Sequence, residues 1–96
     1  MDVWRLDKFK TLVGEKVKIS DLEEKNACEV IVSDVVQSHN LGTEWESFSV
    51  IMNTEAEVEQ GSFILSHEDA GTTTLFITAN SSMELESVFN LHVGAH

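Results

Sequence analysis

The sequence contains one cysteine, no proline and no long apolar run, and each shortage excludes a class of protein. Cys28 alone cannot form an internal disulfide, so the fold does not depend on a disulfide framework. No stretch approaches the roughly 18–20 apolar residues of a membrane-spanning helix, and the opening MDVWRLDKFK lacks the features of a signal peptide. We therefore expect a cytoplasmic protein without membrane contact, in which Cys28 is a small apolar core residue.

Lysine and arginine are absent after residue 25. All 6 basic residues lie before that point together with six of the 17 acidic ones, so the later residues supply the whole net charge of −11. Because sequence-independent binding to nucleic acid depends on cationic contacts, we expect no direct binding of DNA or RNA. An acidic surface suits a basic protein partner, including one that handles nucleic acid, or serves only to keep the protein soluble.

A length of 96 residues with 42% hydrophobic residues predicts one domain, residues 1–96, with a single core. Near the start, Leu6, Phe9 and Leu12 recur at helical spacing and are followed by Val13. We expect a short helix there, with Asp7 as its cap and a left-handed glycine, residue 14, after its end.

After this helix the apolar pattern changes to alternation, which indicates six strands at residues 15–20, 27–36, 44–53, 62–67, 72–79 and 84–93. The links between them are short, and short links favour antiparallel neighbours. The predicted fold class is mainly β: a small antiparallel six-stranded meander forming a barrel or a flattened sandwich, with one short N-terminal helix. The sequence has no proline to block an edge strand. Either the sheet closes, or its edges are protected by charge, bulges or a second copy of the chain, so homodimerisation is one of the alternatives.

The segment SHEDAG places an imidazole beside two carboxylates, at His67, Glu68 and Asp69. Aspartate and glycine at this spacing suit a tight turn, and the sequence shows no nucleophile or polarising partner for a general acid or base. We interpret the segment as a hairpin corner, in which His67 is partly buried and bonds a backbone group.

Metal sites are weakly indicated. His92 and His96 stand four residues apart, but in a strand and its tail, and neither His39 nor His67 completes a zinc spacing. The glutamates at 55, 57 and 59 would project from one side of an extended segment, yet the loop pattern of calcium sites is missing, which favours a solvated link. We predict no catalytic residue, no cofactor-binding residue, no metal ligand and no cofactor, and we expect no enzyme.

Short motifs along the chain form an ordered pattern: Phe9, Leu12, Val13 and Gly14; Phe48, Ser49 and Val50; Gln60, Gly61, Phe63, Leu65 and His67; Gly71, Leu75 and Phe76; Val88, Phe89 and Asn90. This pattern resembles a family of small bacterial domains of unknown function with the motifs F-x-x-L-V-G, F-S-L-x-F, Q-G-x-Y-x-L-x-H, L-F-L and Y-E-x-V-F-N. The sequence departs from the family pattern where Phe63 replaces a tyrosine, Met52 replaces a phenylalanine and Leu85 replaces an aromatic residue, and each change keeps apolar bulk. The resemblance implies a shared fold but no mechanism. The family's association with bacterial gene neighbourhoods that contain phage-tail-collar-like proteins implies an accessory or assembly role.

Two polar residues of this pattern, Gln60 and Asn90, are not explained by the hydrophobic alternation. We predict that their side-chain amides bond backbone groups. These bonds would fix the bend at Gly61 and the end of the last strand.

The leading functional expectation is an uncharacterised non-catalytic interaction or accessory domain with a protein partner of unknown identity, with self-association left open. One alternative is a small-ligand-binding β-barrel whose interior pocket is lined by Trp45, Phe48, Phe63 and Phe89, and a cavity above about 300 Å³ would favour it. The other is an acidic decoy for a basic protein that handles nucleic acid, which needs carboxylates along one surface.

Overall fold

Six strands and one short helix make up the fold in a computed structural model, which describes residues 4–37 and 45–92. In chain order they are α1 (Leu6–Lys10), β1 (Lys16–Ser20), β2 (Ala27–Gln37), β3 (Trp45–Asn53), β4 (Gly61–His67), β5 (Gly71–Ala79) and β6 (Glu84–His92). Each strand lies within one residue of its predicted bounds at the described ends. His39 and His96, considered above as metal ligands, lie outside the described residues.

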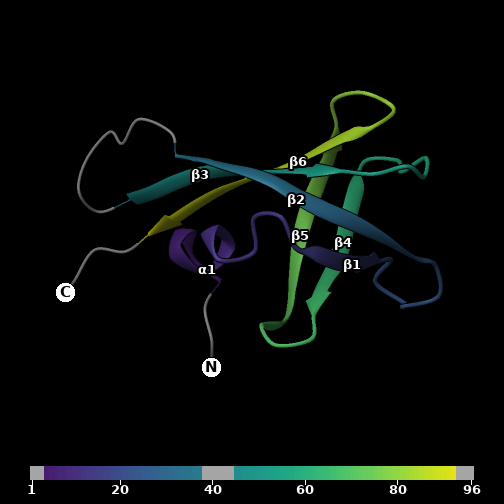
Figure 1. The fold of residues 1–96 in the computed structure, drawn as a ribbon, viewed down its shortest axis with the longest axis horizontal. Coiled ribbons are helices and arrows are strands. Elements are labelled where there is room, and N and C mark those ends of the chain that lie inside the picture. The colour runs from purple at the N-terminus through teal and green to yellow at the C-terminus, as the bar shows by residue number, and fades with distance from the viewer. Residues whose placement is uncertain (1–3, 38–44, 93–96) are drawn as a thin grey trace.

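The strands form a closed antiparallel barrel in the order β1-β2-β3-β6-β5-β4, and β4 pairs back onto β1 (Figure 1). The predicted mainly β class with one N-terminal helix is confirmed, and the closed form is a barrel. One connection differs from a simple meander, because β3 pairs with β6 and not with β4. Residues 54–60, here called the crossover, join β3 to β4 and give the Greek-key order in which β4 lies beside β1.

Two short ladders close the ring. β1 pairs with β4 only through residues 18–20, and β5 pairs with β6 only through Thr78 and Ala79. In Figure 1, β2, β3 and β6 run across the view, whereas β4 and β5 stand steeply to them. A register shift between Val32 and Asp34 leaves Ser33 as an extra residue in β2, a bulge that lets this long strand bend. The barrel is therefore two crossed groups of strands, joined along narrow contacts.

Alternate apolar residues of the strands point inward, as the period of two predicts. The buried apolar residues are Trp4, Leu6, Phe9, Leu12, Val17, Ile19, Val30, Val32, Phe48, Val50, Met52, Leu65, Leu75, Ile77 and Leu85. Ile31 is exposed on the outer face, where the alternation marks it as the exception in β2. Cys28 packs against this core but stays partly exposed, so its predicted core position is confirmed only in part.

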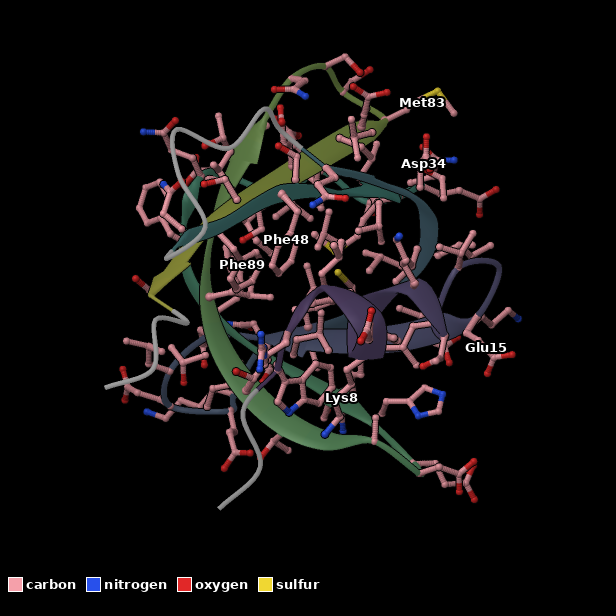
Figure 2. The ribbon with its side chains drawn as sticks, turned by 90° about the vertical axis from the view of Figure 1, so that its left-hand side faces the viewer. Lys8, Glu15, Asp34, Phe48, Met83 and Phe89 are labelled. Atoms are coloured by element: carbon pink, nitrogen blue, oxygen red, sulfur yellow. The ribbon has the colours of Figure 1, made fainter. Side chains whose placement is uncertain are left out.

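Helix α1 packs against β2 and β3 inside one mouth of the barrel (Figure 1). Its buried Phe9 ring lies 5.6 Å from Phe48 and 4.9 Å from Phe89, measured between ring centroids. Figure 2 shows Phe48 and Phe89 side by side in the interior, and their stacked rings are 5.0 Å apart. The Trp4 ring covers Phe9 from the N-terminal side at 5.3 Å, and the Lys8 ammonium lies 4.5 Å from the Trp4 ring. The helix thus closes the mouth with aromatic rings.

The ends of α1 correct two details of the sequence prediction. The residue that precedes the helix as its cap is Arg5, without a side-chain cap bond, and Asp7 lies in the first turn. In the first turn the Asp7 carboxylate still interacts favourably with the positive end of the helix dipole. Val13 is 45% exposed and not part of the buried stripe, whereas Gly14 has the predicted left-handed backbone with φ of 89°.

Candidate functional site

The segment SHEDAG is a hairpin corner, as predicted. His67 at the end of β4 pairs with Gly71 at the start of β5, and Gly71 has a φ of 95° that suits the end of a three-residue loop. The ring nitrogen Nδ1 of His67 accepts hydrogen bonds from the backbone N–H groups of Asp69 and Ala70, both at 3.1 Å. Its Nε2 must then carry the proton that faces the Glu15 carboxylate at 3.2 Å. Nδ1 holds the turn and Nε2 faces Glu15 ahead of β1, so His67 bonds backbone groups as predicted.

The crossover is held at its start by Thr54. The buried Thr54 hydroxyl accepts a hydrogen bond from the Ala56 N–H at 3.0 Å. The backbone N–H of Thr54 donates to the Met83 carbonyl at 3.0 Å. Val58 packs against the core, whereas the three glutamates of the crossover, Glu55, Glu57 and Glu59, are exposed. Ala56 is exposed as well, and the chain bends at residues 55 and 56, so the crossover is not the regular extended segment on which the expected row of carboxylates depends.

Three open hollows surround the crossover. The β4 groove, of about 730 Å³, is lined by residues 19, 21, 26–28 and 56–63. The β2 groove, also about 730 Å³, is lined by residues 16, 28–31, 53–56 and 83, and a third hollow of about 690 Å³ by residues 55, 57, 58, 79 and 81–83. Each hollow has at least one crossover glutamate in its wall. These carboxylates consequently lie in the walls of the hollows.

The electrostatics of these hollows are mainly negative. The β4 groove is lined by Asp21, Glu57 and Glu59, and the residues that line it include no lysine or arginine. In the β2 groove Lys16 stands beside Glu29 and a crossover carboxylate. The β4 groove is therefore the one whose wall favours a cation most clearly.

Asp21 organises the loop between β1 and β2 at one end of the β4 groove. Its Oδ1 accepts hydrogen bonds from the backbone N–H groups of Lys25 at 2.9 Å and Glu23 at 3.1 Å, and its Oδ2 accepts one from the Asn26 amide at 3.0 Å. The bond from the Lys25 N–H, with smaller contributions from Asn26 and Glu23, lowers the pKa of the Asp21 carboxyl below its ordinary value. The carboxylate is thus ionised and shapes the groove wall.

Cys28 lines both the β4 and the β2 groove. Burial raises the pKa of its thiol, because desolvation disfavours the thiolate. A thiol of raised pKa is a poor nucleophile near neutral pH. The position of Cys28 thus gives the grooves an apolar floor and not a reactive group.

The interior pocket considered from sequence is occupied by the protein itself. Phe48 is fully buried and stacked on Phe89, and the Phe9 ring of α1 fills the space beside both. Phe63 is partly buried and lines the β4 groove instead, while the side chain of Trp45 is outside the described residues. The three expected lining residues whose side chains are described, Phe48, Phe63 and Phe89, therefore do not surround a common cavity.

The described residues show no other centre for chemistry of the expected kinds. Among residues 4–37 and 45–92, no group of three His, Cys, Asp or Glu side chains is arranged to hold a metal ion. The side chain of His92 is outside the described part of the chain. Over the same described ranges, no helix is long and apolar enough to cross a membrane.

Asn90 and Gln60 do not make the backbone bonds predicted for them. The Asn90 Oδ1 accepts a hydrogen bond from the Ser47 hydroxyl at 2.7 Å, so its partner is a side chain on β3. The prediction failed because the cross-strand neighbour of a residue is not visible in local sequence. Gln60 is exposed and lines the β4 groove, without a hydrogen bond from its side chain to the described residues.

Sequence reasoning missed two parts of this site. Met83, 62% exposed, lies in the wall of two hollows, and its place is set by the loop that follows β5. The Asn80 amide donates to the carboxylates of Glu84 and Glu86, at 3.1 and 2.9 Å, and so holds two further acids on the nearby start of β6. A turn with two Ser residues before alternating Glu residues is the only local signal, and it does not indicate a groove.

The geometry defines a class: a small closed Greek-key barrel plugged by a helix, with open acidic grooves around one connection. A family model described as a domain of unknown function, DUF6916, matches residues 4–89, and the chain belongs to this family. The match agrees with the resemblance to a small domain family of unknown function. No curated protein and no solved structure matches the chain.

Proposed function

We propose that this chain is a non-catalytic interaction domain that binds a positively charged segment of a partner protein at the grooves around the crossover. The observation that carries the proposal is the exposure of Glu55, Glu57 and Glu59 in the walls of open hollows of about 690 to 730 Å³. Carboxylates along a hollowed surface attract cations and raise the rate of encounter with a basic partner.

The apolar parts of the same hollows support this partner class. Met83 is largely exposed, and Ala56, Val58 and Cys28 line the recesses beside the carboxylates. Lysine and arginine carry long aliphatic stems below their charged heads. A basic segment would place its stems on these apolar walls and its charges near the glutamates.

A non-catalytic role is supported by how the candidate chemical groups are used. The His67 ring holds the β4–β5 turn through Nδ1 and faces Glu15 through Nε2. The thiol of Cys28 has a raised pKa, which keeps it protonated near neutral pH. Neither group is left in the activated state that a nucleophile or general base requires.

The test compares two variants with the same change in charge. Glu57→Gln with Glu59→Gln neutralises two of the three crossover glutamates, and Glu68→Gln with Asp69→Asn neutralises the turn at the other end of β4, about 20 Å away along the strand. Binding of a fluorescent oligolysine peptide is measured by anisotropy at low and moderate salt. The crossover variant should bind about 2- to 30-fold more weakly, since each exposed ion pair contributes about 0.2–1 kcal/mol.

The turn variant should keep the affinity of the unmodified protein to within a factor of about two, because screened charges at that distance contribute little. Equal loss in both variants would show a response to net charge alone and would contradict a defined site. Displacement of a basic nucleic-acid-binding protein from its nucleic acid would assign the partner to the decoy class.

Self-association is a second candidate, favoured by an apolar row on the outer wall. Val36, Ser49 and Val88 are consecutive partners across β2, β3 and β6, and the two valines are 49% and 60% exposed. The Ser87 hydroxyl donates to the Phe76 carbonyl at 2.7 Å, which places the 54% exposed Phe76 beside this row. Light scattering of the purified protein distinguishes a dimer from a monomer.

A further inference from the structure

The edge of β4 is covered along only part of its length. The pairing of β1 with β4 ends at Ser20 and Ile64, and beyond it the chain turns away at Asp21, whose N–H donates to the Asn26 carbonyl at 3.1 Å. Residues 61–63 of β4 pair with β5 on one side. On the other side, no strand in residues 4–37 and 45–92 pairs with them.

This uncovered edge forms one wall of the β4 groove. Gly61, Ser62 and Phe63 line the groove together with the residues after Asp21 on one side and the crossover on the other. In an antiparallel ladder, alternate residues direct their N–H and C=O groups to opposite edges of the strand. Part of the backbone of residues 61–63 is therefore turned toward an open recess of about 730 Å³ and away from β5.

The β4 groove is open, and its wall has a defined charge. Glu57 and Glu59 lie in the crossover wall and Asp21 at the loop end, and the lining residues include no cation. Ile19 and Phe63 provide apolar surface within the same recess. An uncovered strand edge pairs with an extended backbone, and the carboxylates select positive side chains on that backbone.

We propose that the β4 groove binds an extended, positively charged peptide segment, which adds as a short strand to the uncovered edge of β4 at residues 61–63. The inference rests on the proposed function and specifies how the partner binds. The segment continues the ladder that β1 leaves at Ser20. Side chains that alternate along it face the glutamates on one side and the apolar groove wall on the other.

The test uses three peptides of equal charge with capped ends: Lys-Val-Lys-Val-Lys-Val, the same peptide N-methylated at its valines, and the same peptide N-methylated at its lysines. N-methylation removes the amide donor and leaves the side chains and the charge in place. In an added strand only one of the two sets of N–H groups faces β4. One methylated isomer should therefore bind about tenfold or more weakly, and the other within about threefold of the parent peptide.

Binding is measured by isothermal titration calorimetry, and backbone amide shifts are followed in ¹⁵N-labelled protein. The amides of residues 61–63 should shift on binding of the parent peptide and become protected from hydrogen exchange. The amides of residues 68–70, in the turn at the far end of β4, should not change. This control keeps the chain unaltered, so the result does not depend on whether a variant folds.

The outcomes separate the two proposals. If the parent peptide binds and both methylated isomers bind equally well, or are weakened equally, strand addition is refuted while acidic docking stands. If the parent peptide binds without shifts at residues 61–63, the edge is not the site. If the parent peptide does not bind at all, the proposed function fails, and strand addition fails with it.

Discussion

Replacement of Phe9 by alanine tests whether the aromatic plug holds the barrel together. The Phe9 side chain is fully buried, and its ring lies 4.9 to 5.6 Å from the rings of Trp4, Phe48 and Phe89. Removal of a buried phenylalanine ring costs about 3–5 kcal/mol in the free energy of unfolding. The loss of aromatic pairs favours a value in the upper part of that range. We expect Phe9→Ala to lower the free energy of unfolding by about 4 kcal/mol. This is a large share of the total, because the free energy of unfolding of a typical domain is only about 5–15 kcal/mol.

The plug should be sensitive to this change because α1 has no stability of its own. It contains five residues, and isolated helices below about 12–15 residues are marginal in water. Its position therefore depends on burial of Leu6 and Phe9. Without the ring, the helix should detach or pack loosely, and the rings of Phe48 and Phe89 should become accessible to solvent.

The assay is urea unfolding followed by tryptophan fluorescence. With a slope of about 1–3 kcal/mol per molar urea, the midpoint should fall by about 2 M. Phe9→Leu, which fills part of the space, keeps the variant measurable and should cost about 1–2 kcal/mol. Val13→Ala is the matched control, because Val13 is 45% exposed just after the helix and should change stability by less than about 0.5 kcal/mol. A cost below about 1 kcal/mol for Phe9→Ala would refute the plug, since burial of the ring alone predicts more.

Two further predictions concern the β1–β2 loop. Glu24 has a φ of 60°, a left-handed backbone that favours glycine, so Glu24→Gly should raise the melting temperature by about 2–6 °C, whereas the control Glu23→Gly should lower it. Asp21→Asn should destabilise the loop near neutral pH, as monitored by thermal melting. The folded-state pKa of Asp21 is lowered from 3.8, so its stabilisation is fully present above that value and is lost as the pH falls through the lower folded value. The difference between the two proteins should shrink over that acidic range, and a constant difference would exclude ionisation as its cause.

The strands could be predicted from sequence because their signal is local. Val17 and Ile19 in β1, or Val50 and Met52 in β3, alternate with polar residues, and a half-buried strand requires this pattern. The sequence pattern included Val13 in the apolar face of helix α1, because Val13 continues the helical spacing. In the structure Val13 lies after the helix, in the turn before β1, and its side chain is exposed. Periodicity identifies which residues can share a face, and tertiary packing decides which of them become buried.

The ring order could not be predicted in the same way. The crossover of seven residues reaches at most about 25 Å when extended, which suffices either for a wide hairpin or for a passage across the mouth of a small barrel. Nothing in its local sequence distinguishes the two, because both place Val58 inward and the glutamates outward. The preference for adjacent sequential strands therefore gave the right neighbours at every connection except this one.

That one connection places the carboxylates on which the proposed binding depends. If β3 and β4 were neighbours, the crossover would be an ordinary hairpin loop, and its carboxylates would stand away from any uncovered strand edge. Because the crossover passes to the far side of the ring, it places Glu57 and Glu59 in the groove that residues 61–63 also line, beside a loop that Asp21 folds away from β4. Charge, recess and unpaired backbone thus meet at the point where the chain departs from a simple meander. The acidic composition was visible in the sequence, but the place of these carboxylates beside an uncovered edge depends on this topology.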